Sequence, residues 1–290
     1  MKSVVKYKNR GKWGDNKYRG NCTGHLFIDL IEHFQPKLFV DACMGSGTSK
    51  EVCKELGTPF IGLDLRHGFN FLKDSILHQL PFQADICFTH PPYHNLVTYS
   101  GDQWGESNKF DLSRCGSYDE FLEKSQVMLL NQREATRDGG IYCTLIGDLR
   151  KNGHFHSTQA DYQSLMPKSE LSSIVIKVQN NHASSFKSYS GNFISIQLEY
   201  LVIWKKKLQS FWAIGLETAS SLKSRINMTW RSIIRIALMN LSNKASLSHI
   251  YDEVLKIAGE KIKSNSNWKA KIRQQLQIHF ASVERGIWAI

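Results

Sequence analysis

The sequence predicts an α/β protein whose main domain is a doubly wound, mostly parallel sheet, followed by a small and mostly helical domain. Two observations support this prediction. Between residues 26 and 146, short apolar runs that suit buried strands alternate with segments whose apolar residues recur at helical spacing. After Lys205-Lys206-Lys207 the pattern changes to helices alone. We therefore expect a main domain over residues 1–210 and a second domain over residues 211–290.

Each element of the main domain is expected from a local pattern. Residues 1–20 are polar and rich in glycine, so we expect them to be irregular. Apolar residues at helical spacing predict helices over residues 26–34, 49–56, 70–79 and 119–133. Apolar runs predict strands over residues 38–40, 60–63, 86–88, 141–146, 172–178 and 194–204. The last two strands have little helix between them, which favours an antiparallel hairpin at one edge of the sheet. Polar loops are expected over residues 94–118, 150–170 and 180–192.

The second domain is expected to contain three helices and a short final strand. Apolar stripes at helical spacing predict the helices over residues 230–241, 247–257 and 268–280, and a turn with a strand follows over residues 283–290. Such stripes are most often core positions, so we expect them to form the core of this domain.

The composition is that of a packed protein. With 41% hydrophobic and 22% charged residues in a chain of 290, disorder is excluded. The longest apolar runs, such as residues 200–204, are far shorter than the roughly 20 residues of a membrane-spanning helix. The first 20 residues lack the apolar core of a signal peptide, and the six cysteines are irregularly spaced with no C-x-x-C pair. We therefore expect a cytoplasmic protein with no bound metal.

The positive charge is concentrated at one end of the chain. The formal net charge is +11, and residues 205–290 hold 15 of the 37 Lys and Arg residues but only 5 of the 26 Asp and Glu residues. A nearly neutral body with a basic second domain suggests that this domain faces a polyanion, although a well-solvated surface is an alternative.

A first candidate site follows the strand at 38–40. Residues 41–48 read D-A-C-M-G-S-G-T, in which Gly45 and Gly47 allow the backbone to approach a ligand closely. The next strand ends at Asp64, where a carboxylate can accept both hydroxyl groups of a ribose. This order of elements favours a ligand with a single nucleoside. NAD is a weaker alternative, because Lys50 stands where the dinucleotide fingerprint has its third glycine, and a turn that binds nothing is another.

A second candidate site follows the strand at 86–88. Residues 89–93 read T-H-P-P-Y, and two prolines at a strand end fix a rigid backbone whose carbonyl groups can face a cavity. Tyr93 offers a flat face for stacking on a planar ring. His90 and the Pro91 carbonyl can accept the two hydrogens of an exocyclic amino group, which leaves the nitrogen lone pair free to attack. An ordinary turn is the alternative.

Together, the two motifs resemble those of the S-adenosylmethionine-dependent DNA methyltransferases that act on adenine N6 or cytosine N4. Residues 41–48 resemble the family's cofactor motif D-P-F-M-G-S-G-T, and residues 90–93 resemble its catalytic motif [D/N/S]-P-P-[Y/F/W]. The resemblance covers roughly residues 20–205 and implies a Rossmann-like sheet. Residues 21–30 stand where that family places a helix on the methionine end of the cofactor. It also implies that double-stranded DNA is the partner and that the target base is extruded from the duplex before methylation.

Site residues follow from this resemblance by position. The implied catalytic residues are His90, Pro91, Pro92 and Tyr93. The implied contacts to S-adenosyl-L-methionine are Asp41, Cys43, Met44, Gly45, Gly47, Thr48, Asp64, Asn70 and Thr89. Lys and Arg residues in the polar loops are candidates for DNA contacts, namely Lys109, Arg114, Arg150, Lys151, Lys168 and Lys187, with His154 and Tyr189. His154 and His156 form an H-x-H pair, but no third metal ligand is near them in the sequence.

Two departures from the family pattern bear on the chemistry. The first catalytic position is His90 instead of Asp, Asn or Ser, and a protonated imidazole could not accept a hydrogen bond, so activity is expected to fall at low pH. The M-G-S-G-T spelling is commoner in relatives whose two motifs occur in the reverse order. Adenine N6 is favoured as the target, with cytosine N4 next. Methylation of RNA or of a protein amide, and a DNA-binding regulator with a decayed methylase body, are further alternatives.

The second domain resembles the winged helix-turn-helix domains attached to some DNA-modifying enzymes. Residues 285–290 read R-G-I-W-A-I, which matches the ending R-G-[IV]-[WY]-x-[LI] of those domains. The helix expected at 268–280 carries Lys269, Lys271 and Arg273, as a recognition helix would. A cognate restriction nuclease is a further expected partner if the protein belongs to a restriction-modification pair.

Overall fold

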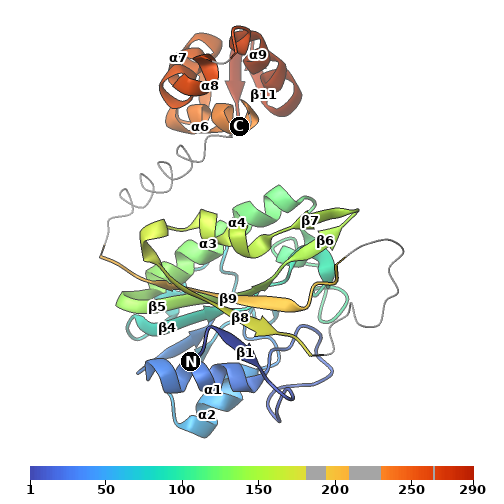
Figure 1. The fold of residues 1–290 in the computed structure, drawn as a ribbon, viewed down its shortest axis with the longest axis vertical. Coiled ribbons are helices and arrows are strands. Elements are labelled where there is room, and N and C mark those ends of the chain that lie inside the picture. Colours follow the sequence, from blue (N-terminus) through green and yellow to red (C-terminus); the bar gives the residue numbers. More distant parts are fainter. Residues whose placement is uncertain (181–193, 209–229, 264) are drawn as a thin grey trace. The chain divides into compact units, whose positions relative to one another are not determined.

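The structure is a computed structural model that describes residues 1–180, 194–208, 230–263 and 265–290. The chain divides into two compact units, Met1–Ile214 and Gly215–Ile290 (Figure 1). The division falls among residues outside the described parts, and each unit is considered by itself. None of the helices in the described residues is both long and apolar enough to cross a membrane.

A seven-stranded sheet forms the centre of the first unit. Its strands lie in the order β1-β8-β9-β5-β4-β2-β3. Their bounds are β1 Val4–Lys6, β2 Phe39–Asp41, β3 Phe60–Gly62, β4 Ala84–Thr89, β5 Thr136–Gly147, β8 Leu171–Val178 and β9 Leu198–Lys205. β9 is antiparallel to both of its neighbours, whereas the other described pairs in this sheet are parallel. The carboxyl ends of β2, β3, β4 and β5 therefore lie at one edge, beside the amino end of β9.

Helices cover both faces of this sheet (Figure 1). α1 (Gly24–Phe34) and α2 (Thr48–Leu56) lie on one face, and α3 (Tyr118–Ala135) and α4 (Thr158–Leu165) lie on the other. Alternate strand residues belong to two separate cores: Val40 packs in the core that contains α3, and Phe39 packs in the core that contains α1. Strands buried on both faces explain the continuous apolar runs in the sequence, and the expected Rossmann-like α/β fold is confirmed.

The helices begin and end where their flanking residues dictate. Thr23 caps α1 by accepting a hydrogen bond from the backbone N–H of His25, and Gln35 ends it in the left-handed conformation just before Pro36. Ser117 caps α3 by accepting from the N–H of Glu120. The helix in the connection between β4 and β5 is thus fixed at its amino end.

Four expectations for the first unit need correction. Residues 4–6 are not irregular but pair with β8 as an added edge strand. The β8–β9 pair is antiparallel as expected, but β9 lies inside the sheet because β8 and β1 continue beyond it. Residues 70–79 form turns with one 3-10 helix, Leu77–Gln79, because the Asn70 and Asp74 side chains accept backbone N–H groups of a turn. The expected loop at 150–170 contains α4 and a small hairpin, β6 (Leu149–Lys151) and β7 (His154–His156).

The second unit combines helices with a small antiparallel sheet. Its helices are α6 (Trp230–Asn240), α7 (Leu247–Ile257), α8 (Gly259–Lys263) and α9 (Trp268–His279). The sheet has the order β10-β12-β11, with bounds β10 Lys244–Ser246, β12 Ile287–Ala289 and β11 Ala281–Glu284. The three apolar stripes meet in one core, through residues that include Ile233, Ile250, Val254, Ile272 and Leu276. α8 and β10 were not expected from the sequence.

Candidate active site

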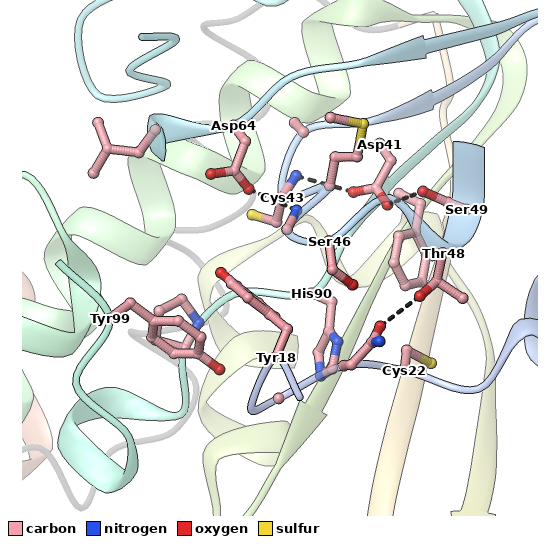
Figure 2. A pocket seen from close by; sticks show the side chains of 18 of the residues that line it. Tyr18, Cys22, Asp41, Cys43, Ser46, Thr48, Ser49, Asp64, His90 and Tyr99 are labelled. Atoms are coloured by element: carbon pink, nitrogen blue, oxygen red, sulfur yellow. Dashed lines mark hydrogen bonds between the residues drawn. The ribbon is translucent and has the colours of Figure 1, made fainter. Parts of the chain in front are cut away.

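A pocket opens at the carboxyl ends of β2, β3 and β4. This is the edge at which open α/β sheets bind their ligands. Asp41, Cys43, Met44, Gly45 and Thr48 line it from the glycine turn, Asp64 from the end of β3, and His90 and Pro92 from the diproline turn. Figure 2 shows Cys43, Thr48, Asp64 and His90 around one space. The two turns that the sequence singled out therefore open onto one pocket.

Buried hydrogen bonds hold the glycine turn in shape. Asp41 accepts from the backbone N–H of Cys43 at 2.9 Å and from the Ser49 hydroxyl at 2.6 Å. Burial raises the pKa of Asp41 to about 7 in spite of these hydrogen bonds. Gly45 and Gly47 have φ values of 54° and 86°, which favour glycine. A Cβ on Gly45 would also lie 3.1 Å from the ring of Tyr18, so this position is restricted in both conformation and space.

Asp64 ties the glycine turn to the next strand. Its Oδ2 accepts from the backbone N–H of Gly45 at 2.8 Å, and its Oδ1 accepts from that of Arg66 at 2.8 Å. The carboxylate is thereby oriented at the pocket wall, where the sequence placed a ribose-binding group. An oriented carboxylate next to an open glycine turn suits a nucleoside, so the residues present fit the expected cofactor.

Besides Tyr93, four predicted site residues lie outside the pocket lining. Thr89 is fully buried, and its hydroxyl lies 2.8 Å from that of Thr144, on the face of the sheet toward α3. The Asn70 side chain accepts from the backbone N–H of Leu72 within a turn. Gly47 caps α2, and Pro91 is buried. For Thr89 and Asn70 the structure thus shows contacts within the protein, and neither residue lines the pocket.

Tyr93 does not line the pocket, contrary to the role expected of it as a stacking platform. Its ring lies against Gly147 at the end of β5, where a Cβ would come within 2.6 Å of the ring. Its hydroxyl donates to Oε1 of Glu199 at 2.6 Å and lies 2.9 Å from Nε2 of His90. Burial raises the pKa of Tyr93, and the neighbouring carboxylate of Glu199 raises it further. The ring is therefore held between the sheet and His90.

The imidazole of His90 is neutral in this environment. Burial lowers its pKa to about 4, even though the carboxylate of Glu199 acts in the opposite direction. Burial would raise the pKa of Glu199, but the ammonium group of Lys177 and His90 itself hold it at about 2. We therefore expect His90 to lose its ability to accept a hydrogen bond only well below neutral pH, near pH 4.

Sequence reasoning missed a segment that crosses the pocket. Tyr18, Gly20, Asn21 and Cys22 line it, and the Thr48 hydroxyl donates to the Asn21 side chain at 2.5 Å. The stretch at 21–30 was expected near the cofactor, but residues 13–20 contain no recognisable motif. Their position beside the pocket depends on long-range contacts. For example, the backbone N–H of Gly14 donates to Glu51 at 2.9 Å.

A second group of missed residues comes from the loop after the diproline turn. The ring centroids of Tyr99 and Tyr18 lie 5.9 Å apart, and both rings line the pocket (Figure 2). Trp104 and Phe110 line it as well. The pocket wall is therefore rich in aromatic residues, although Tyr93 is not one of them.

The predicted DNA contacts of the main domain differ in their placement. Nε of Arg114 donates to the Ser100 carbonyl at 2.7 Å, and its guanidinium pairs with Asp102 at 3.0 Å, so Arg114 fastens its own loop. Lys109 is exposed beside the ring of Phe110. Lys168 is exposed but precedes β8, at the sheet edge opposite the pocket, which argues against a contact with the target DNA.

The remaining candidates lie on the small hairpin, outside the described residues, or in the second unit. Arg150 and Lys151 belong to β6, and Arg150 donates to the Ile194 carbonyl at 2.9 Å. His154 and His156 lie on β7, and no group of metal ligands occurs in the parts of the chain that the structure describes. Lys187 and Tyr189 fall outside those parts. On α9, Lys269, Lys271 and Arg273 are all exposed, whereas Ile272 and Leu276 of the same helix are buried.

Comparisons with known proteins found similar solved structures. No family model matches it, and no curated protein does. The similar structures include TrmN from Thermus thermophilus, with 13% identity over 65% of this chain and 50% of that one (TM-score 0.36). A candidate DNA modification methylase from the same species, TTHA0409, solved with S-adenosyl-L-methionine, has 18% identity over 49% of this chain and 54% of that one (TM-score 0.33).

An S-adenosylmethionine-dependent methyltransferase from Archaeoglobus fulgidus has 13% identity over 66% of this chain and 96% of that one (TM-score 0.38). The chain thus spans only about half the length of TrmN and of TTHA0409. All these TM-scores lie below 0.5. The Rossmann-like α/β fold rests instead on the strand order and on the helices on both faces of the sheet.

Proposed function

We propose that this protein is an S-adenosylmethionine-dependent DNA methyltransferase that modifies an exocyclic amino group, with adenine N6 as the favoured target. One observation carries the proposal: the glycine turn and the diproline turn line the same pocket, with Asp64 on one side and His90 on the other. A cofactor beside the glycine turn and a base beside the diproline turn would then meet in one space.

The residues that would hold the cofactor are those of the glycine turn and the end of β3. Gly45 leaves room for close approach, Asp64 is oriented to accept ribose hydroxyl groups, and the Tyr18 ring closes the wall above the turn. When bound, S-adenosyl-L-methionine supplies an electrophilic methyl group on a sulfonium.

The diproline turn would orient the target amino group. His90 would accept one of its hydrogens, so that the nitrogen lone pair can point to the methyl carbon. The Pro91 carbonyl, which the sequence also suggested as an acceptor, belongs to a buried residue outside the pocket lining. Methyl transfer to this nitrogen would break the C–S bond, leave its electron pair on sulfur, and release one proton from the nitrogen to solvent. Positioning is the main contribution of the protein to such a reaction. Tyr99 and Trp104 are better placed than Tyr93 to contact the extruded base, because they line the pocket.

The second unit would supply affinity for double-stranded DNA. The described part of the second unit combines helices with a three-stranded antiparallel sheet, as a winged helix domain does, and α9 exposes three cations. Phosphate contacts from such a helix are independent of sequence and weaken with salt. The proposal assigns DNA binding to this unit and methylation to the first.

The decisive experiment is transfer of labelled methyl groups from S-adenosyl-L-methionine to unmethylated DNA, with total RNA and a protein extract tested in parallel. Mass spectrometry of the digested DNA separates N6-methyladenine from N4-methylcytosine. We expect labelled DNA containing N6-methyladenine. His90→Ala should abolish transfer, whereas His78→Ala, which changes an exposed histidine outside the pocket, should not.

Other outcomes would select other functions. N4-methylcytosine would support the cytosine enzyme, and label in RNA alone would support an RNA methyltransferase. Cofactor binding with no transfer to any of the three substrates would support a DNA-binding regulator. A full rate in His90→Ala would contradict the role of the diproline turn.

A further inference from the structure

We propose that Glu199 acts through Tyr93 to fix the tautomer of His90, so that Nδ1 of the imidazole is always the atom that accepts from the target amino group. The inference rests on the proposed methyltransferase function and adds Glu199, Tyr93 and Lys177 to it as positioning residues. Sequence reasoning had assigned no role to Glu199 or Lys177.

The register of three strands brings these residues together. Glu199 on β9 lies opposite Gly147 of β5 on one side and opposite Lys177 of β8 on the other. Because Gly147 has no side chain, the ring of Tyr93 can lie over it and reach Glu199. The hydrogen bond between them joins residues separated by 106 positions in the chain.

Each oxygen of Glu199 has one partner. Its Oε2 is paired with the ammonium group of Lys177, and its Oε1 accepts from the Tyr93 hydroxyl at 2.6 Å. The side chains of Lys177 and Glu199 are only 12% and 9% exposed, so the ion pair is protected from water. A carboxylate paired with a cation stays ionised and can only accept hydrogen bonds.

The protons available in this chain of hydrogen bonds determine the tautomer of the imidazole. The Tyr93 hydroxyl has a single proton, and it is used in the bond to Glu199. The Tyr93 oxygen can therefore only accept at its 2.9 Å contact with Nε2 of His90, so Nε2 must carry the imidazole proton. In a neutral imidazole, Nδ1 is then unprotonated and carries a lone pair.

Nδ1 is the nitrogen left for the pocket. Nothing within the described residues forms a hydrogen bond with it, and His90 lines the pocket, where Figure 2 shows its ring among the converging side chains. With this tautomer, His90 offers the acceptor that an amino hydrogen needs. The opposite tautomer would point an N–H at an N–H and repel the target.

Wild-type protein gives the first test, without any substitution. In the full-length chain labelled with ¹⁵N-histidine, the two ring nitrogens of a neutral histidine have clearly different chemical shifts, and the signals of His90 are those absent in His90→Asn. We expect the proton of His90 to be on Nε2. A proton on Nδ1 would overturn the proposal, whatever the activity of the enzyme.

Glu199→Gln gives the second test, because it reverses the direction of donation. The amide oxygen would stay with Lys177, so the amide N–H would donate to Tyr93, and the Tyr93 hydroxyl would then donate to His90. We expect the proton of His90 to move to Nδ1 and the rate constant kcat of methyl transfer to fall about tenfold or more, as for loss of one hydrogen bond. Binding of S-adenosyl-L-methionine should stay within about twofold, because Glu199 does not line the pocket. Glu106→Gln, in an exposed loop, is the matched control and should change neither quantity.

A double substitution separates this role from a purely structural one. The amide oxygen of Asn accepts without any tautomer, so in the His90→Asn background Glu199→Gln should cause no further loss of kcat beyond about twofold. A folded Glu199→Gln protein with the wild-type rate would contradict the proposal, as would equal losses in both backgrounds. If wild-type protein methylates no substrate while the proton of His90 lies on Nε2, the proposed function fails and the tautomer assignment stands.

Discussion

The backbone N–H of Gly45 donates to Oδ2 of Asp64 at 2.8 Å, which joins the turn after β2 to the end of β3. The same carboxylate accepts from the N–H of Arg66, so its two oxygens hold two segments of the pocket wall. The group expected to bind the ribose thus also shapes the turn beside it.

The first prediction follows from this double role. Asp64→Ala should weaken binding of S-adenosyl-L-methionine by about tenfold to a hundredfold, because the substitution removes both a ligand-binding group and the support of the Gly45 turn. Isothermal titration calorimetry measures the dissociation constant. Asp74→Ala, which removes a carboxylate that accepts from a backbone N–H outside the pocket, is the control. Equal affinities of Asp64→Ala and wild type would exclude Asp64 from the cofactor site.

The second prediction concerns pH and the stability of the fold. The pKa of Asp41 is raised by burial to about 7 from 3.8, so between these values the folded state holds a proton that the unfolded state does not. This contribution to stability is present at low pH and is lost as pH rises through 7. His90, with a pKa lowered by burial from 6.5 to about 4, contributes in the opposite direction, and its contribution is lost as pH falls toward 4.

Each substitution should therefore reveal the contribution of the group that it removes. Relative to wild type, Asp41→Asn should gain about 1 kcal/mol in the free energy of unfolding per pH unit between pH 5 and 7. As pH rises from 4.5 to 6.5, the free energy of unfolding of His90→Asn should fall relative to that of wild type. Urea unfolding at several pH values measures both, and curves parallel to that of wild type would show that neither group is shifted.

The third prediction concerns a buried ion pair at the other edge of the sheet. The guanidinium of Arg133 donates to both oxygens of Glu170, at 2.8 and 2.6 Å, and Tyr142 and the backbone of Lys207 donate to the same carboxylate. Glu170→Ala leaves Arg133 buried without its counter-charge and should lower the free energy of unfolding by about 3–5 kcal/mol.

Because this ion pair lies far from the pocket, its loss should lower the stability of the fold without weakening cofactor binding. Glu170 precedes β8 at the edge opposite the pocket, so folded Glu170→Ala protein should bind S-adenosyl-L-methionine as tightly as wild type. Chemical denaturation and calorimetry on the same samples give both values. Glu120→Ala, which removes a partly exposed i,i+4 pair with Lys124, should cost much less stability.

The fourth prediction tests the second unit. Replacement of Lys269, Lys271 and Arg273 by alanine should weaken DNA binding and reduce the dependence of log Kd on log salt by about one unit for each phosphate that the variant no longer neutralises. Fluorescence anisotropy at four or five salt concentrations measures the slope. Lys168→Ala, which also removes an exposed cation but from the edge opposite the pocket, should leave the slope unchanged. An unaltered slope in the triple variant would argue against α9 as the DNA-binding helix.

Local patterns in the sequence were sufficient for the frame of the fold. Apolar runs at 38–40, 60–63 and 86–88 become β2, β3 and β4, because a strand buried on both faces needs apolar side chains throughout. Local patterns did not predict the structure of segments whose conformation depends on hydrogen bonds to a distant strand or to side chains. Val4–Lys6 forms a strand only because β8 offers it an edge, and the apolar residues at 70–79 form turns because Asn70 and Asp74 bind the backbone.

The sequence by itself determined that a glycine turn and a diproline turn follow parallel strands, and parallel strands bring such turns to one edge. Only the tertiary structure decided which side chains of these turns enter the pocket. Tyr93 lies against Gly147 and donates to Glu199, whereas Tyr18 and Tyr99 take places at the wall. The physical reason is that a motif fixes the backbone at a strand end, while the direction of a side chain depends on its hydrogen-bond partner. For Tyr93 that partner lies 106 positions away, on a strand that runs antiparallel to its neighbours.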